Sequence, residues 1–292
     1  MRQAEALRQT QPAFRTATEV HALDDGPDSS SRAGTVAAHR RAVERVITHA
    51  RERLCEPISL HDMSRVAYIS PFHFNRVFHE ITGLPPAKFV SAMRLEQAKR
   101  LLLNTHLSIT DICYEVGYNS LGTFTRRFTE LVGLGPREFR YLAERITPAS
   151  VESLCAHYAE RSGPAMPGEG VAGFVEALTP SAGPIFVGLF PAHIPQSRPV
   201  GGVLLTSPGV FRIGPVPDGT YHLLAAALPR VADTLGYLLP DTANLSVGAG
   251  NGPVIVREGR AAARSHISLR PMTLTDPPLL VSLPFLLADT LK

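Results

Sequence analysis

The sequence predicts a multidomain protein in which an all-α double helix-turn-helix domain is followed by an all-β, sandwich-like domain. Three observations predict this fold. Residues 66–89 recur, in one further copy, as residues 116–139, and each copy has the helix start and end signals of a helix-turn-helix unit. Beyond Arg145 lie 18 of the 25 prolines and 16 of the 23 glycines. Short β-rich runs separated by turn residues occupy that second part.

The two copies agree at eleven positions. The first copy has Val66, Tyr68, Ser70, Phe74, Arg76, Phe78, Glu80, Gly83, Leu84, Pro86 and Phe89. The second copy has Val116, Tyr118, Ser120, Phe124, Arg126, Phe128, Glu130, Gly133, Leu134, Pro136 and Phe139. A short repeat with helical periodicity indicates a duplicated structural unit rather than a solenoid.

The N-terminal part divides into a leader and a basic domain. Residues 1–35 are polar, and residues 24–34 (DDGPDSSSRAG) have the composition of a linker, so we expect a disordered leader. Residues 36–145 hold 16 Lys and Arg against 11 Asp and Glu, a net charge of +5, whereas the whole chain carries +3. A phosphate backbone is a natural partner for such a segment.

The first unit begins with a short helix over residues 60–67. A second helix, residues 70–82, then starts at Ser70-Pro71 and ends at Gly83, because serine is a good N-cap, proline fits the first helical position and glycine ends helices. Its inward face is apolar: Phe74, Val77, Phe78 and Ile81. Its outward face carries Phe72, Asn75, Arg76 and His79.

The second unit has the same pattern of helix start, apolar face and helix end. Its second helix covers residues 120–132, with Ser120 as the N-cap and Gly133 at the end. Phe124, Phe128 and Leu131 face inward, and Gly122, Thr125, Arg126 and Thr129 face outward. Arginine can bond guanine at two atoms and asparagine can do the same for adenine, so these outward faces suit base edges and phosphates. The sequence therefore predicts double-stranded DNA as the partner.

A long helix over residues 87–103 joins the two units. Its seventeen residues span ~25 Å at ~1.5 Å each. With the flanking units added, this is comparable to the ~34 Å between successive major grooves on one face of DNA. One polypeptide could then occupy both grooves, and its operator need not be palindromic.

Residues 36–145 resemble the DNA-binding domain of the AraC/XylS family of transcription regulators. The resemblance is carried by these motifs: Ser70–Phe78 with Thr82-Gly83, Arg94-Leu95-x-x-Ala98-x-x-Leu101-Leu102, Ile112-Cys113-x-x-Val116-Gly117-Tyr118, Phe124-x-Arg126-x-Phe128, and Gly135-Pro136-x-x-Phe139-Arg140. It implies base or backbone contacts from Phe72, Asn75 and Arg76 in the first helix, and from Leu121, Gly122, Thr125 and Arg126 in the second.

Two features depart from that family. Leu121 and Gly122 stand where polar residues are common, which implies weaker readout there; Leu121 suits a thymine methyl or a sugar, and Gly122 suits close approach of the backbone. The family also commonly places its effector domain before the DNA-binding part, and here the order is reversed.

After residue 145 we expect a linker over residues 146–182, with a helix over 148–161, and then a β-domain over residues 183–292. The predicted strands are Ile185–Phe190, Val203–Thr206, Tyr221–Leu228, Val254–Val256, His266–Leu269 and Leu280–Leu283. Residues 211–225 read as two strands joined by a Pro-Asp-Gly turn. With residues 185–190 they are similar to the carboxypeptidase-regulatory, prealbumin-like sandwich, which implies a structural or interaction module.

We find no motif for catalysis, a metal or a cofactor. Gly248–Pro253 reads as a hairpin turn rather than a phosphate loop. A metal or acid–base set would need His193, His222, His266, Asp218 and Asp241, whose spacing is arbitrary. Cys55, Cys113 and Cys155 have no metal-ligand or redox spacing. We therefore expect no enzymatic activity.

The predicted function is that of a sequence-specific transcription regulator with two recognition helices, acting in the cytoplasm without a membrane segment. Its β-domain would sense an effector or mediate association. An alternative is a β-domain that binds a metabolite or sugar, or that forms a dimer, with the helical part as a DNA tether. A small-molecule effector, RNA polymerase and a second copy of the chain are open as further partners.

Overall fold

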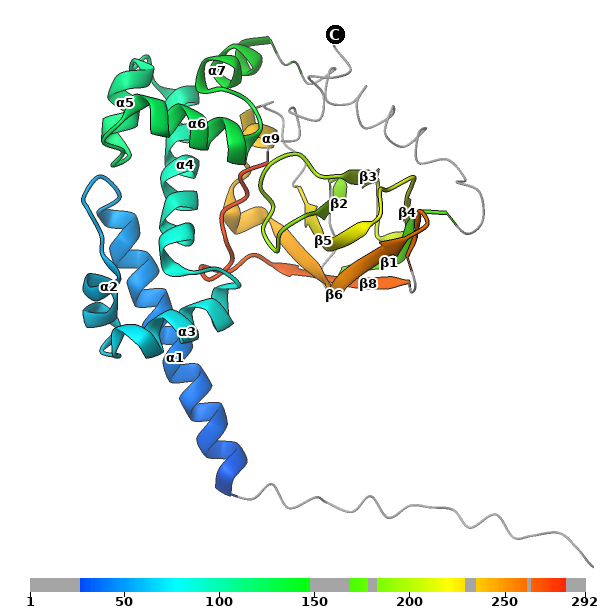
Figure 1. Cartoon of the computed structure of the whole chain (residues 1–292), viewed down its shortest axis with the longest axis horizontal. Coiled ribbons are helices and arrows are strands. Elements are labelled where there is room, and N and C mark those ends of the chain that lie inside the picture. The colour runs from blue at the N-terminus through cyan, green and yellow to red at the C-terminus, as the bar shows by residue number, and fades with distance from the viewer. Residues whose placement is uncertain are drawn as a thin grey trace, which may run out of the picture. The chain divides into compact units, whose positions relative to one another are not determined.

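The computed structural model describes residues 27–145, 147, 169–177, 183–228, 235–261 and 264–281 (Figure 1). The predicted helix over residues 148–161 lies outside these residues. The helices are α1 (Pro27–Glu52), α2 (Leu60–Ala67), α3 (Pro71–Thr82), α4 (Pro86–Asn104), α5 (Ile109–Glu115), α6 (Leu121–Val132), α7 (Pro136–Arg145), α9 (Leu235–Leu238) and the 3-10 helix η1 (Thr242–Asn244). None of the helices among these residues is long and apolar enough to cross a membrane.

Helix α1 begins earlier than expected. It starts at Pro27, inside the segment that we expected to be a disordered linker, so a boundary at residue 36 would cut through a helix. Proline is well tolerated in the first turn of a helix, and no further proline interrupts residues 28–52. The apolar positions from Ala42 to Ala50 are buried.

Local sequence chemistry sets the other helix ends. Ser120 caps α6 as predicted, whereas the Ser70 side chain makes no capping bond on α3. Ser59 and Ser108 each form a capping box, with Asp62 and Asp111 respectively. Gly83 and Gly133 end α3 and α6 in the left-handed conformation that glycine adopts at low cost. The predicted bounds of both second helices are thus confirmed to within one residue.

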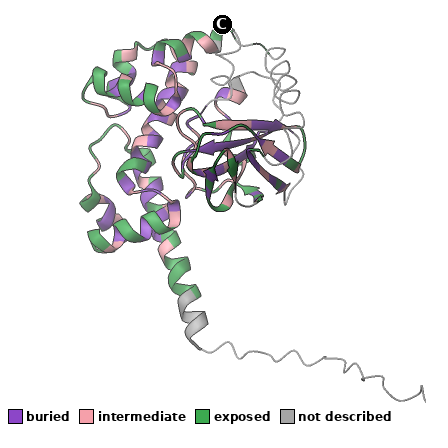
Figure 2. Cartoon of the chain, turned by 45° about the vertical axis from the view of Figure 1, so that its right-hand side comes forward, coloured by how far each residue is buried: buried purple, intermediate pink, exposed green. Residues whose placement is uncertain are grey.

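Helix α4 joins the two units. In Figure 1, the first unit, α2 and α3, lies toward the end where α4 begins, and the second unit, α5 and α6, lies toward the end where it finishes. Buried apolar side chains line it, and the buried side of each helix in Figure 2 faces this shared core. Phe89, Val90, Ala92, Met93, Leu95, Ala98 and Leu102 are its buried apolar residues.

Two arginines tie the helix connections to this core. The Arg94 guanidinium donates to the carbonyl oxygens of Leu54, at 3.0 Å, and Glu56, at 2.8 Å. In the same manner Arg140 donates to Leu102, at 3.1 Å, and Leu107, at 2.8 Å. Each arginine therefore fixes the connection that leads into the first helix of one helix-turn-helix unit.

The second domain is β-rich, as predicted. Its strands are β1 (Val171–Ala177), β2 (Ile185–Phe190), β3 (Gly201–Leu205), β4 (Gly209–Ile213), β5 (Gly219–Ala227), β6 (Ser246–Arg257), β7 (Arg260–Ala261) and β8 (Ser265–Pro271). They form one sheet of order β3-β2-β5-β6-β8-β1-β4, with β7 beside β6. Among the strands that the structure describes, β1 and β8 pair in parallel and the other strand pairs are antiparallel. Because β3 and β4 follow one another at its two ends, the sheet nearly closes into a barrel around its own apolar core.

Three local predictions in this domain were wrong. Gly248–Pro253 is not a hairpin turn but part of β6, where the pairing with β5 shifts register between His222 and Leu224; such a bulge uses the freedom of Gly252, at φ 153°. Leu279–Val281 form no strand, and residues 282–283 lie outside the described residues. The two strands around the Pro-Asp-Gly turn do form, but they are not partners, because β4 pairs with β1 and β5 with β2 and β6.

The carbonyls of Leu279 and Leu280 are satisfied by a buried lysine instead of a neighbouring strand. Lys99 on α4 is fully buried, and its Nζ donates to these two oxygens at 3.3 and 3.2 Å. The same nitrogen lies 5.8 Å from the centre of the Phe139 ring. Leu280 itself is buried in the core of the helical domain. Burial lowers the pKa of Lys99 from 10.5 to about 8, because the apolar surroundings disfavour the ammonium form.

This lysine predicts a pH dependence of stability. Between pH 8 and 10.5 the unfolded chain would bind the proton that the folded chain has released, so the free energy of unfolding rises with pH across that window, by up to about 3 kcal/mol. Below pH 8 both states are protonated and this contribution is flat. Urea unfolding at pH 7.5, 8.5 and 9.5 measures the rise. Lys99→Met should abolish it, and parallel profiles for both proteins would contradict the assignment.

Candidate nucleic-acid interface

Helix α3, the second helix of the first helix-turn-helix unit, is held in place by a ladder of aromatic rings. The Phe74 and Phe78 centroids lie 5.5 Å apart, and Phe78 meets Phe89 of α4 at 5.5 Å, both in edge-to-face geometry. All three rings are buried. This packing confirms the predicted inward face and leaves the opposite face to solvent.

Helix α6, the second helix of the second helix-turn-helix unit, is held in the same way. Phe124 lies 5.7 Å from Phe128, and Phe128 lies 5.8 Å from Phe139 of α7. Tyr118 extends the ladder, 5.4 Å from Phe124. The repeat in the sequence is therefore a repeat in packing, with each helix docked by equivalent rings.

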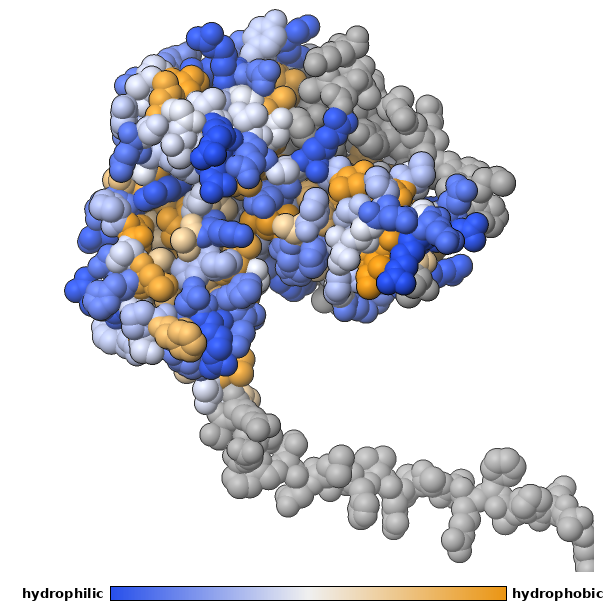
Figure 3. Space-filling view, viewed as in Figure 1, coloured by the Kyte–Doolittle hydropathy of each residue, from blue (hydrophilic) through white to orange (hydrophobic). Residues whose placement is uncertain are grey.

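The outward positions of both helices are accessible. Phe72 is 86% exposed and Leu121 is 39% exposed. Exposed side chains also include Asn75, Arg76, His79 and Arg126, the backbone is exposed at Gly122, and Thr125 is half-buried. The structure thus brings the predicted residues together as two groups of four, one on each helix. On the face shown in Figure 3, hydrophilic side chains cover most of the helical domain.

The arginines of these two helices differ in their pairing. Arg76 donates to Glu80, at 3.3 Å, and its other nitrogen lies 3.2 Å from Nδ1 of His73. Arg127 pairs with Glu130 at 3.1 Å. Within the residues that the structure describes, Arg126 has no ion pair. A guanidinium without a carboxylate partner is ready to bind an external acceptor.

Comparison with known proteins identifies a helix-turn-helix domain in this part of the chain. Residues 63–141 match the family model described as a helix-turn-helix domain. The uncharacterized HTH-type transcriptional regulator YbfP of Bacillus subtilis (strain 168) is 32% identical over 115 residues, which are 39% of this chain and 39% of YbfP. Residues 63–141 are a helix-turn-helix domain.

Two solved structures are similar to the helix-turn-helix domain. A transcriptional regulator described by its AraC-type DNA-binding domain, from Chromobacterium violaceum, is 27% identical and covers 40% of this chain and 98% of that one, with a TM-score of 0.35. The DNA-binding domain of AdpA, solved in complex with a target DNA, is 28% identical and covers 35% and 95%, with a TM-score of 0.34. The family model ends before β1, and the chain spans about two-fifths of the length of YbfP.

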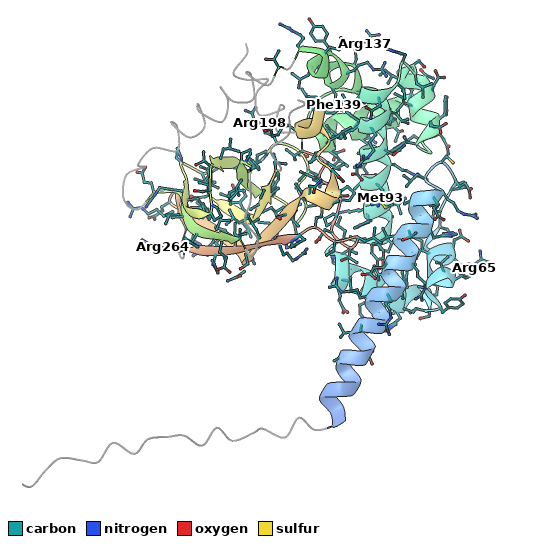
Figure 4. All side chains as sticks on the ribbon, turned by 180° about the vertical axis from the view of Figure 1, so that it is seen from behind. Arg65, Met93, Arg137, Phe139, Arg198 and Arg264 are labelled. Carbon is teal, nitrogen blue, oxygen red and sulfur yellow. The ribbon has the colours of Figure 1, made fainter. Side chains whose placement is uncertain are left out.

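One exposed residue of the helix-turn-helix domain was missed by reasoning from sequence. Tyr68 follows α2 in the left-handed conformation, at φ 59°, with 88% of its surface exposed. Its repeat partner Tyr118 is half-buried, and its hydroxyl lies 3.2 Å from Oγ of Ser91. Both copies have tyrosine at this position, so the sequence alone gives no reason to expect different environments. Only the packing shows that Tyr68 is exposed and Tyr118 is half-buried. Figure 4 shows Arg65 projecting from the outer side of α2, the helix that Tyr68 follows.

The residues that we considered for a metal or acid–base set lie apart. His193 and His222 meet edge to face at 5.2 Å, whereas His266 pairs with Glu176 at 3.4 Å. Asp218 accepts hydrogen bonds from two backbone amides, and Asp241 caps η1. No group of three or more metal-ligating side chains occurs among the described residues.

Proposed function

We propose that the chain is a cytoplasmic transcription regulator that binds double-stranded DNA with α3 and α6 in successive major grooves. The observation that carries the proposal is the repeated packing, which presents two exposed helix faces from one polypeptide. The names of similar proteins agree with it, since YbfP is described as a transcriptional regulator. The length of α4, 19 residues or ~28 Å, suits a separation of about one DNA turn.

Each face offers distinct chemistry. Arg126 is the leading candidate for a bidentate contact to guanine, and Asn75 for a contact to adenine. Arg76 would exchange Glu80 for a base or phosphate, so part of its binding free energy offsets the lost ion pair. Phe72 and Leu121 would touch apolar groups of the duplex, and Tyr68 would reach the backbone.

Selection of the full-length protein on randomised duplex DNA, at two salt concentrations, tests this function. Phosphate contacts weaken steeply with salt whereas base readout sets the sequence preference, so the two concentrations separate them. A bipartite motif with half-sites about one turn apart is expected. Binding without sequence enrichment would refute the two-helix regulator.

Gly122→Ala separates stability from DNA binding. A Cβ at Gly122 would approach only Oγ of Ser120, at 3.9 Å, so alanine fits and should stabilise the helix by roughly 0.5–1 kcal/mol. If the backbone at Gly122 approaches the duplex closely, the same methyl group weakens binding. We expect a higher melting temperature together with a higher Kd, from calorimetry and fluorescence anisotropy. Unchanged affinity would contradict close approach at this residue.

A further inference from the structure

A cavity of about 450 Å³ lies between the sheet of the β-domain and the last turn of α3. One side is formed by β2, β5, β6 and the segment 272–281, and the other by Glu80–Gly83. Binding sites for small organic molecules typically have roughly 300–1,000 Å³. The cavity is therefore large enough for one such molecule.

The floor of the cavity is apolar because of the strand register. Phe186 on β2, Ala226 on β5 and Val247 on β6 are neighbours across three strands. They point away from the core of the sheet, which contains Val187 and Ala225 instead. A Cβ at Gly188 or Gly202 would lie 2.8 or 3.0 Å from the Phe186 ring. These two glycines therefore leave room for an aromatic ring on the outer face.

The charged groups at the cavity already have partners. Arg270 donates to both carboxylate oxygens of Asp276, at 2.7 and 2.6 Å, and Glu80 accepts from Arg76. A charged ligand would find no free counter-charge there, which disfavours its desolvation. The Tyr237 hydroxyl, also in the lining, has no hydrogen-bond partner among the described residues. The lining thus fits a neutral ligand with one hydrogen-bonding group.

The cavity wall is also part of the first recognition helix. Gly83, the C-cap of α3, lies against His193 so closely that a Cβ would be 3.2 Å from Nδ1. Glu80, in the last turn of α3, is the carboxylate that holds Arg76 at 3.3 Å. A molecule in the cavity therefore contacts the turn that controls the pairing of an expected DNA-contacting arginine.

We propose that this cavity binds a neutral, largely apolar small molecule, aromatic or alicyclic, and that the bound molecule changes DNA binding by α3. The second half rests on the proposed function, whereas the first does not. The ligand would shift DNA affinity by its preference for one arrangement of residues 80–83 and of the Glu80–Arg76 pair. Since α6 contributes nothing to the lining, the effect should concern one half-site.

Binding can be tested with N-phenyl-1-naphthylamine, a neutral fluorescent dye, titrated into the full-length protein. We expect saturable fluorescence at one dye per chain. Ala249→Trp places an indole in the lining and should weaken binding at least tenfold. Val210→Trp is the matched control on β4, 77% exposed and outside the lining, and should bind like the wild type. Val247→Phe is a second filling variant should Ala249→Trp fail to fold.

A second titration measures the coupling. Saturating dye should change the Kd for the selected duplex at least fivefold, the lower end of typical coupling between sites, and the change should vanish in Ala249→Trp. Absence of saturable binding, or equal binding by the filling variants, overturns the site. Binding with an unchanged Kd for DNA overturns the coupling. A chain that binds the dye but no duplex refutes the proposed function and with it the coupling, while the cavity assignment stands.

Discussion

Arg126→Ala should weaken binding to the selected duplex by about 1–3 kcal/mol, roughly 5- to 150-fold in Kd. The Arg126 guanidinium is exposed on α6 and has no ion pair within the described part of the chain, so its loss removes an external contact without freeing a carboxylate. Sequence preference should relax only at the base pairs beneath α6. Anisotropy titrations on the selected duplex, and on duplexes with either half scrambled, measure both effects.

Arg127→Ala is the matched control. It removes the same charge from the next residue, but Arg127 pairs with Glu130 and lies outside the predicted outward face. We expect a small loss that is the same for every sequence. Arg76→Ala should relax preference in the other half of the site. If Arg126→Ala weakened all duplexes equally, the arginine would contact phosphate only.

Gly117→Ala should destabilise the helical domain by about 2–4 kcal/mol. Gly117 has φ 81°, and a Cβ there would lie 2.3 Å from the Leu54 carbonyl oxygen and 3.0 Å from the Arg94 guanidinium. The methyl group would thus displace the oxygen to which Arg94 donates. Scanning calorimetry of the full-length protein measures the change.

Gly259→Ala provides the comparison for that substitution. Gly259 has a similar φ, 71°, but nothing lies within 4 Å of its Cβ position. Its substitution should lower the free energy of unfolding only by the cost of holding alanine in the left-handed conformation, about 1–2 kcal/mol. Equal destabilisation by the two substitutions would mean that the contact with Leu54 contributes nothing.

The helical domain was predictable because its signals are local. Ser59, Ser108, Gly83 and Gly133 set helix ends by chemistry that acts within one turn, and the aromatic spacing identified the inward faces. What the sequence could not show was pairing between side chains. The Glu80–Arg76 bond and the opposite environments of Tyr68 and Tyr118 depend on rotamers and neighbours that two similar copies do not share.

The β-domain was predicted less completely because its pairing is non-local. Strand β1 falls in the expected linker, and it is fixed by partners far along the chain, β4 and β8. Its pattern, VAGFVEA, contains one glycine and two alanines, which have weak strand preference. Leu280 looked like a strand residue, yet its carbonyl accepts from Lys99, 181 residues away. No local pattern encodes such a contact.

The continuity of α4 from Pro86 to Asn104 bears on which operators the chain can read. Inserting one base pair between two half-sites moves the second by ~3.4 Å and turns it by roughly 35° around the duplex. A single unbroken helix has no joint that could follow such a change. The protein would then require the correct rotation between the two half-sites as strictly as it requires the sequence of either half-site. At a site with the wrong rotation the second helix could not bind, and the affinity gained by tethering it to the first would be lost.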